Sequence, residues 1–246
     1  MAADRKIAVL GDIHANLDAL QAVLADAKAY GATEYLCVGD VVGYNACPNE
    51  CCEIVRSLGA PTVCGNHDRY SAFGESLEEF SPLAAVMVKW TRETLSAENA
   101  EWLRSLPFTE VVPGGITLVH ATLDDPEAWG YVFDDLDAET SISYQKTQIC
   151  FHGHTHVPVA FEMHHGRVSR LAPGTFRLEA GRKYFLNTGS VGQPRDGDPR
   201  ASYCLYSPGE RRVEYRRLEY DVPAAQRRID LAGLPPRLAD RLGEGR

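Results

Sequence analysis

The feature that most constrains this chain is a series of short apolar, β-branched runs that each end in a polar turn. Three runs in the first half lead into GDIH, GDVV and GNHD, and two in the second half lead into His120 and into the pair His154 and His156. Side chains placed just beyond the carboxyl ends of strands converge on one rim of an α/β sheet. The sequence therefore predicts an α/β fold with one polar site at that rim.

Glycines stand immediately before several of these polar residues. Because glycine lacks a Cβ atom, it lets the backbone turn sharply and approach a site closely. We expect this role for four of them: Gly11, Gly39, Gly65 and Gly153.

Strand-like and helix-like segments alternate in the first half of the chain. Residues 6–11 form a strand-like run, and residues 16–29 then carry apolar side chains at helical spacing. The pattern returns with a strand at 33–39, a helix at 48–59 and a further strand at 61–65. Repeated β-α units favour right-handed connections and a largely parallel first sheet.

The rest of the chain has a different pattern. Residues 77–106 look helical throughout, with Pro82 and Ser96 as the expected starts of two helices. Glycine-containing turns then separate short β-rich stretches, which is the spacing of antiparallel hairpins in a second sheet. We expect a single domain over residues 1–246, in which 223–246 form a polar, arginine-rich tail with weak helical periodicity, packed on the surface or partly frayed.

Charge and hydropathy exclude several classes of protein. The chain has 246 residues and a formal net charge of −9, so its overall field argues against non-specific binding to nucleic acid. No apolar run reaches the ~18 residues that a membrane span requires. The N-terminus lacks the apolar segment and cleavage site of a secretory signal, so we expect a cytoplasmic location.

The seven cysteines are an odd number in a chain without an export signal, and this favours reduced thiols over a disulfide framework. Cys47, Cys51, Cys52 and Cys64 are the alternative, as ligands of zinc or of an iron–sulfur cluster. No paired C-x-x-C spacing is present, so burial of these side chains is the favoured interpretation.

Each polar motif is weak evidence when it is taken alone. A GDxH turn can be a helix cap, His120 can be a surface histidine, and His154 and His156 can simply share one face of a strand end. Five separately placed motifs in a fixed order, each after an apolar run, are hard to obtain by chance. We therefore interpret them as one site.

The order of these motifs resembles the calcineurin-like metallophosphoesterase superfamily, whose signature is D-x-H, G-D, G-N-H-[DE], H and G-H-x-H. The match spans residues 7–156, and the runs 39–50, 151–158 and 187–203 extend it to a bacterial branch of small, single-domain members. The resemblance implies a four-layer α/β/β/α sandwich, with two mixed sheets flanked by helices. It also implies hydrolysis of a small phosphate ester.

The resemblance further implies two divalent metal ions that share one ligand, Asp40. It assigns Asp12, His14, Asp40 and His156 to one ion, and Asp40, Asn66, His120 and His154 to the other. Carboxylate, imidazole and amide ligands suit manganese, and also iron, zinc, nickel or cobalt. Two ions ~3.5–4 Å apart clamp a phosphoryl group and turn a bridging water into hydroxide for in-line attack. The site is then cationic within an acidic protein.

His67 is the expected general acid. It follows the ligand Asn66 but is not itself a family ligand, and an imidazole is suited to protonating a leaving oxygen near neutral pH. We expect the adjacent Asp68 to orient His67 and to favour its charged form. The alternative is a strand-end histidine that pairs locally with Asp68.

Three further residues are candidates for binding the substrate. Asn16 either binds the phosphate or caps the helix that begins there. Ser190, in the glycine-bounded loop 189–192, is expected to line the pocket. Arg195 is expected to reach a phosphate, with a salt bridge inside its loop as the alternative. His152 precedes the H-x-H ligands and is expected to be structural.

The run 39–45 departs from two groups within the superfamily. Serine/threonine protein phosphatases and symmetric dinucleoside tetraphosphatases carry an arginine after the second motif, as in GDxVxRG, and this chain has none there. The missing bidentate clamp favours a phosphodiester over a dianionic monoester. Monoesterase or dinucleoside polyphosphate hydrolase remains the alternative activity.

A scaffold protein with the same fold, like the retromer subunit, is the non-enzyme alternative, and the complete ligand set with His67 argues against it. Asn45 and Ala46 depart from the commoner GYGP, and Thr188 departs from NPGS. These three changes are expected near the pocket, where they would affect which shape of substrate fits.

Overall fold

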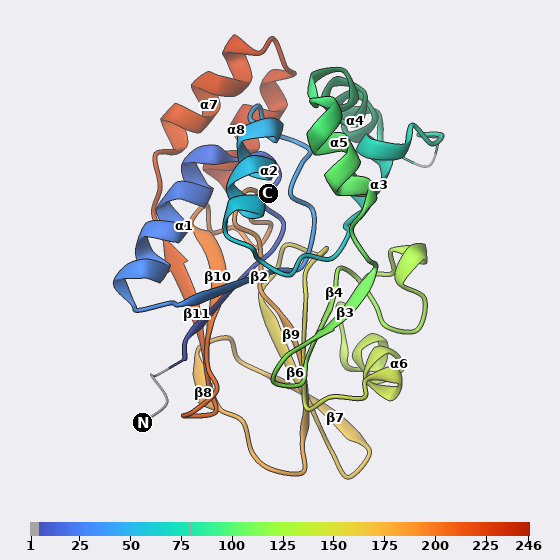
Figure 1. Ribbon diagram of the computed structural model, residues 1–246, viewed down its shortest axis with the longest axis vertical. Coiled ribbons are helices and arrows are strands. Elements are labelled where there is room, and N and C mark those ends of the chain that lie inside the picture. The colour runs from blue at the N-terminus through green and yellow to red at the C-terminus, as the bar shows by residue number, and fades with distance from the viewer. Residues whose placement is uncertain (1–4, 79) are drawn as a thin grey trace.

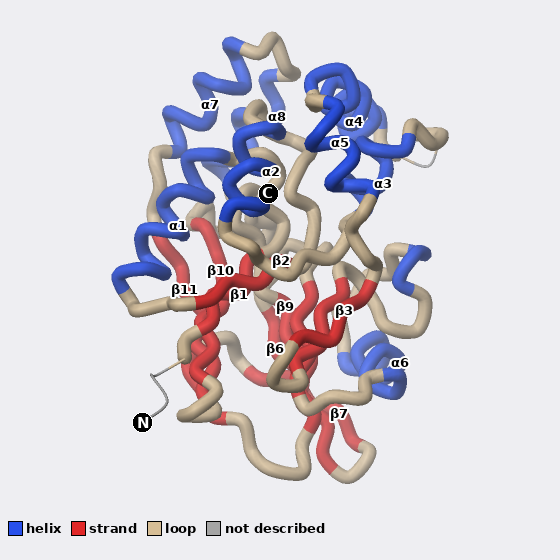
Figure 2. The backbone as a smooth tube through the Cα atoms, viewed as in Figure 1, coloured by secondary structure: helices blue, strands red, loops and turns tan. Residues whose placement is uncertain are grey.

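Two β-sheets packed face to face form the centre of the protein, and helices lie outside them (Figure 1). The computed structural model describes residues 5–78 and 80–246. Most helices lie at one end of the molecule and most strands at the other, with loops crossing between them (Figure 2). Among the described residues, no helix combines the length and the apolar character that crossing a membrane requires.

The first sheet draws its strands from both halves of the chain. From edge to edge it contains β2 (Glu34–Cys37), β1 (Ile7–Leu10), β10 (Ala201–Ser207), β11 (Arg212–Leu218) and β8 (Thr175–Arg177). Only β1 and β2 are parallel, and the other pairs are antiparallel. The prediction of a largely parallel first sheet was therefore wrong. The chain returns to pair with the second edge of β1, which would otherwise expose unpaired backbone groups.

The run 61–65, predicted as a strand, does not form one. It contributes an isolated parallel bridge between Cys37 and Thr62.

The second sheet is also mixed. Its order is β3 (Thr109–Val112), β4 (Ile116–Val119), β5 (Ile149–His152), β9 (Lys183–Asn187), β6 (Val159–His164) and β7 (Arg167–Leu171). The central strands β4, β5 and β9 are parallel, and the outer pairs are antiparallel.

The helices lie between and after these strands. In the described part of the chain they are α1 (Leu17–Ala29), α2 (Pro48–Ser57), α3 (Asn66–Phe73), α4 (Pro82–Thr94), α5 (Ala97–Arg104), α6 (Asp135–Tyr144), α7 (Val222–Leu231) and α8 (Pro236–Glu244), with a short 3-10 turn at Pro126–Ala128. Ser81 and Ser96 cap α4 and α5 through their side-chain oxygens, which confirms the two predicted helix starts.

Alternating residues of the strands fill separate layers of the core. Val9 of β1 packs between the two sheets with Phe151 of β5. Leu10 points to the opposite face and packs with Leu20 of α1. The outer face of the second sheet is covered by α6 through a cluster that includes Phe185. This period of two produces the four layers of the predicted α/β/β/α sandwich.

The segment 223–246, in which weak helical periodicity was expected, lies in α7 and α8 and contributes buried side chains. Leu238 and Leu242, one helical turn apart, are buried together with Ile229 in a cluster that includes Tyr44. Leucines spaced four residues apart lie on one face of a helix, so even a short polar segment can bury an apolar stripe. As a result α8 packs beside the loop that follows β2 (Figure 1).

Candidate metal centre

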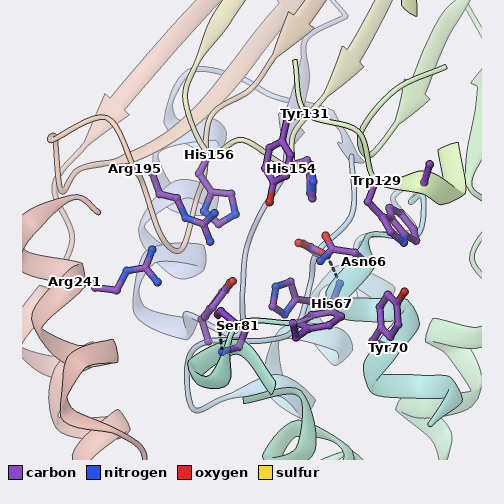
Figure 3. A pocket seen from close by; sticks show the side chains of 15 residues that line it. Asn66, His67, Tyr70, Ser81, Trp129, Tyr131, His154, His156, Arg195 and Arg241 are labelled. Atoms are coloured by element: carbon purple, nitrogen blue, oxygen red, sulfur yellow. Dashed lines mark hydrogen bonds between the residues drawn. The ribbon is translucent and has the colours of Figure 1, made fainter. Parts of the chain in front are cut away.

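Seven polar side chains, six of them buried and Asn66 half-buried, converge where the strands of both sheets end. Asp12 and His14 follow β1, Asp40 follows β2, His120 follows β4, and the remaining members are Asn66 at the start of α3 and His154 and His156 after β5. Several of them line a pocket of about 480 Å³, which suits a small substrate (Figure 3).

The carboxylate of Asp40 lies between two groups of donor atoms. Its Oδ2 atom is 3.4 Å from Nε2 of His14 and 3.3 Å from Nε2 of His120. In the first group, Oδ1 of Asp12 lies 3.3 Å from Nε2 of His156. The ligand atoms of each group lie within 4.8 Å of one another, and Asp40 belongs to both groups. This is the arrangement that a bridging carboxylate requires.

Asn66 extends the second group. Its Oδ1 atom lies 3.3 Å from Nε2 of His120, and Nδ1 of His154 lies 3.2 Å from the same nitrogen. Carboxylate, imidazole and amide donors therefore surround this position without a thiolate, which suits a divalent transition metal of intermediate hardness.

Main-chain carbonyls fix the orientation of three histidine rings. The Nδ1 atoms of His14, His120 and His156 lie 3.0, 2.8 and 2.6 Å from carbonyl oxygens of Val42, Val38 and Gln193. A carbonyl only accepts, so each Nδ1 carries a proton, and Nε2 of each ring is the nitrogen that can bind a metal. The Nε2 atoms of His14 and His156 lie 3.0 Å apart. Two facing lone pairs need a cation between them, so these residues fit a metal ion.

Burial sets the protonation of the donor groups. It lowers the pKa of His14 and His156 well below the ordinary value and that of His154 to about 3, so these rings stay neutral as metal binding requires. Burial also raises the pKa of Asp12 to about 7, and the nearby His120 partly offsets this rise. For Asp40, burial acts in the same direction, but the neighbouring histidines outweigh it and hold the pKa below its usual range.

Five of the seven residues adopt a left-handed backbone. The φ angles are 49° for Asp12, 48° for His14, 52° for Asp40, 70° for His154 and 60° for His156. Each such residue costs roughly 1–3 kcal/mol, and strain of this kind concentrates at functional sites because the surrounding structure must hold it. Hydrogen bonds from the site's own backbone supply that support, as in the 2.9 Å bond from His14 N to Asp40 O.

The glycines act mainly because they have no Cβ atom, which lets neighbouring side chains of the site pack against the backbone. A Cβ atom at Gly65 would collide with the carboxylate of Asp40, and one at Gly153 with that of Asp12. Gly39 alone among the four predicted glycines has a positive φ, at 94°. The expected close approach is therefore present, and the sharp turn is made by the polar residues themselves.

The imidazole of His67 faces the pocket (Figure 3). Its ring centroid lies 5.0 Å from that of His14, 4.4 Å from Tyr44 and 5.8 Å from Phe80. Nδ1 is buried against Gly43 and has no hydrogen-bond partner among the described residues. Burial lowers the pKa of His67 to about 4.

Asp68 does not orient His67, contrary to the prediction. Its carboxylate accepts hydrogen bonds of 3.1 Å from the main-chain N–H groups of Gly65 and of Val42. The cause is that α3 begins at Asn66, so successive side chains point about 100° apart. Asp68 is the third residue of the helix, where a carboxylate reaches back to a free N–H of the first turn.

Asn16 and Ser190 support the site and are not among the residues that line the pocket. For Asn16 this is the helix-capping alternative, and for Ser190 it differs from the expectation that it lines the pocket. The Asn16 side chain caps α1 by accepting from Ala19 N at 3.1 Å and donates to Gly192 O at 2.9 Å. The Ser190 hydroxyl donates to Asp12 O at 2.7 Å and is fully buried. Both residues therefore pin the loop that carries Asp12.

Arg195 lines the pocket, as expected for a residue that binds substrate. One terminal nitrogen donates to Oε1 of Gln193 at 2.9 Å, and Nε has no partner among the described residues. His152 stacks on Phe185 with ring centroids 4.0 Å apart, in keeping with the structural role predicted for it.

Several lining residues were missed by sequence reasoning. Four of them are aromatic, and the fifth is an arginine of α8: Tyr70, Phe80, Trp129, Tyr131 and Arg241 (Figure 3). Trp129 and Tyr131 lie in a loop without periodicity, so nothing in the sequence placed them near the histidines. The only available signal for Arg241 was the leucine spacing of its helix.

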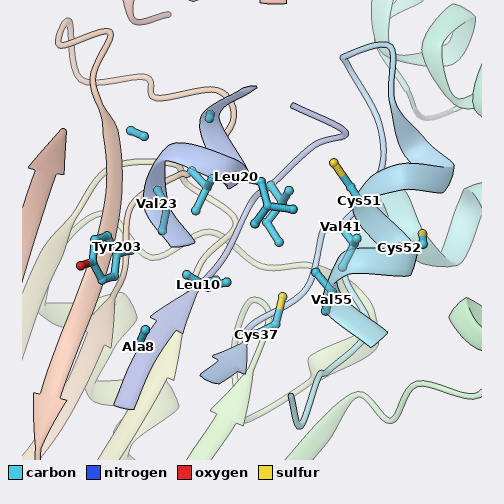
Figure 4. Packing of buried hydrophobic residues seen from close by; sticks show 14 of the residues in the cluster. Ala8, Leu10, Leu20, Val23, Cys37, Val41, Cys51, Cys52, Val55 and Tyr203 are labelled. Carbon is cyan, nitrogen blue, oxygen red and sulfur yellow. The ribbon is translucent and has the colours of Figure 1, made fainter. Parts of the chain in front are cut away.

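The cysteines are part of the core. All seven are free and buried, and neither metal-binding group formed by the described residues contains one. Cys37, Cys51 and Cys52 pack with Leu10 and Val55 (Figure 4). Burial raises the pKa of these thiols, so they remain protonated.

A sandwich of two mixed sheets with buried Asp and His groups at its strand ends defines a metal-dependent hydrolase. The chain belongs to the calcineurin-like phosphoesterase superfamily, whose domain matches residues 6–210. The protein is thus a metal-dependent phosphoesterase that uses divalent ions.

Similar proteins cover almost the whole chain. The uncharacterized protein MJ0912 of Methanocaldococcus jannaschii is 41% identical over 244 residues, which are 98% of each chain. The crystal structure of a metallophosphoesterase from Sphaerobacter thermophilus has a TM-score of 0.85 and 39% identity, and covers 98% of this chain and 99% of that one. A hypothetical protein, PH1004 from Pyrococcus horikoshii OT3, covers 98% of each chain with a TM-score of 0.79 and 22% identity, which supports the fold alone.

Proposed function

We propose that the centre holds two divalent ions, manganese foremost, and that the enzyme hydrolyses phosphodiesters in preference to monoesters. The observation that carries the binuclear assignment is the position of Asp40 Oδ2, 3.4 Å from His14 Nε2 and 3.3 Å from His120 Nε2. One ion takes Asp12, His14, Asp40 and His156, and the other takes Asp40, Asn66, His120 and His154. When bound, the ions supply activation of water at neutral pH and neutralise charge on the phosphoryl oxygens.

His67 donates a proton to the leaving oxygen in this proposal. Its Nδ1 packs against Gly43, which leaves Nε2 as the nitrogen that reaches the pocket. Burial lowers its pKa to about 4, so the ring is neutral at pH 7 without a partner. Asp68 does not supply that partner, and a phosphate anion in the pocket is the group that favours the charged ring. His67 is then protonated, and able to donate a proton, when the substrate is bound.

The walls of the pocket favour an ester with two organic substituents. Tyr70, Phe80, Trp129 and Tyr131 present aromatic surface around the candidate ligands. Aromatic surface of this kind packs against the sugar, base or acyl group of a substituent. The segment after Asp40 also contributes no arginine, so no bidentate clamp from that segment holds the phosphate that is cleaved.

The test compares bis(p-nitrophenyl) phosphate with p-nitrophenyl phosphate on manganese-loaded protein. Both release the same phenolate, so a difference in kcat/KM reflects recognition of the phosphoryl group. We expect the diester to have the higher kcat/KM and metal-free protein to be inactive on both. A preference for the monoester contradicts the diester assignment and leaves the metal assignment intact.

A further inference from the structure

Two arginines from distant parts of the chain enter the same side of the pocket. Arg195 lies in the loop between β9 and β10, and Arg241 lies on α8 (Figure 3). Their guanidinium carbons lie 5.4 Å and 5.8 Å from the ring centroid of Tyr44. Both guanidinium groups therefore lie close to the ring of Tyr44.

Tyr44 also touches the catalytic side of the pocket. Its ring centroid lies 4.7 Å from that of His14 and 4.4 Å from that of His67. The ring of Tyr44 therefore contacts the two arginines as well as His14 of the metal centre and His67, the proposed general acid.

Among the described residues, neither arginine forms a salt bridge with an Asp or Glu side chain. Arg195 donates to Gln193 Oε1, and Nε of Arg241 donates at 2.6 Å to O of Arg246, the last residue of the sequence. Arg237, one turn earlier on α8, has instead a salt bridge of 3.1 Å to Glu244. Burial, followed by the charge of Arg195, lowers the pKa of Arg241 from its ordinary value. Two half-buried like charges at one side of a pocket repel each other, and an anion that binds both offsets this repulsion.

We propose that Arg195 and Arg241 bind a second phosphate group of the substrate, beyond the phosphate that is cleaved. The proposal rests on the phosphodiesterase function proposed above and narrows it. The substrate class is a phosphodiester in which one substituent carries a further phosphate. The planar fork of arginine matches phosphate oxygens in a bidentate manner. The other substituent faces Trp129, across the pocket from the arginines (Figure 3).

The test is equilibrium binding of ligands that differ by one phosphate. Thymidine 5′-monophosphate, thymidine 5′-diphosphate and thymidine 3′,5′-bisphosphate are titrated calorimetrically into manganese-loaded protein at fixed salt. The two doubly phosphorylated ligands differ in the distance between their phosphate groups. We expect at least one of them to bind roughly 10- to 100-fold more tightly than the monophosphate, the range that one charge-assisted hydrogen bond supplies.

Variants of α8 separate a specific contact from general charge. Arg241→Gln removes the charge but keeps a donor for Arg246 O, and Arg241→Lys keeps the charge. Arg237→Gln is the matched control, since it removes an equal charge from the same helix outside the pocket. We expect Arg241→Gln to abolish the gain from the second phosphate, Arg241→Lys to retain part of it, and Arg237→Gln to retain all of it.

Two results overturn the proposal: no gain for either doubly phosphorylated ligand, or an equal gain in wild type and Arg241→Gln. Circular dichroism of each variant shows that α8 has remained folded. The titration uses ligands that are not diesters and does not measure hydrolysis. A failure of the phosphodiesterase assignment is therefore distinguishable from a failure of the second phosphate site.

Discussion

The carboxylate of Asp68 turns away from the imidazole of His67, although the two residues are neighbours in the sequence. Asp68 accepts from Gly65 N and Val42 N, and His67 faces the pocket between Tyr44 and Phe80. The two side chains therefore have separable tasks. Asp68 ties the start of α3 to the loop after Asp40, and His67 is left to respond to the substrate.

Replacing Asp68 should affect stability more than chemistry. Asp68→Asn turns one of two acceptor positions into a donor, so a buried main-chain N–H loses its partner at a cost of about 1–3 kcal/mol. We expect urea unfolding of the metal-free protein to show this loss. The dependence of kcat/KM on the leaving group should remain that of wild type. Unchanged stability together with the kinetic pattern of His67→Ala would show that Asp68 orients the imidazole after all.

Replacing His67 should matter most for poor leaving groups. If His67 protonates the leaving oxygen, His67→Ala lowers kcat/KM by roughly 10²–10⁴-fold for an alkyl or nucleoside leaving group. The loss should be much smaller for p-nitrophenolate, which departs without a proton. The measurement compares paired diesters in wild type and variant at equal metal content, which elemental analysis verifies. Equal losses on both substrates would remove the general-acid role.

The ligand positions were predictable because each motif combines a strand with its own turn. Asp12 and Asp40 follow buried strands directly, so their placement at one rim needs only local structure and the parallel pairing of β1 and β2. Asp68 was not predictable in the same way. GNHD was interpreted as a turn, and only its position as the first turn of α3 shows where each side chain points.

Long-range pairing accounts for the other differences. Strand β10 joins β1 across nearly 200 residues of sequence, and no local pattern specifies which distant strand covers an open edge. Arg241 reaches the pocket because Leu238 and Leu242 bury α8 against the cluster around Tyr44. A sparse leucine stripe among charged residues is too weak a signal to predict that packing.

All seven cysteines should be free thiols in the native protein. They are buried in the core, and burial raises the pKa of those in the first sheet and in α2. Titration with a thiol reagent under denaturing, non-reducing conditions should count seven, and the folded protein should react slowly because the thiols are protonated and inaccessible. A disulfide detected by mass, or visible absorption from an iron–sulfur cluster, would contradict both this and the predicted cytoplasmic location.

The metal content should be close to two ions per chain, and Asp40 should control both. Because Oδ2 of Asp40 faces His14 on one side and His120 on the other, Asp40→Asn removes charge from both positions. His156→Ala is the matched comparison, since His156 belongs to one group only. After reloading with Mn²⁺ and removal of free metal, elemental analysis should give about two ions for wild type, about one for His156→Ala and fewer for Asp40→Asn.

The stability of the folded protein tests the bridging role of Asp40 independently of metal analysis. Asp12 and Asp40 are buried side by side, so cations that bind the folded chain stabilise it by mass action. Chelation should therefore lower the unfolding midpoint of wild type, lower that of His156→Ala by less, and change that of Asp40→Asn least. One ion or fewer in reloaded wild type, or an Asp40→Asn variant with unchanged metal content, would refute the bridging role. Loss of both ions in His156→Ala would instead mean that the two positions fill cooperatively, and the midpoint of that variant should then match that of chelated wild type.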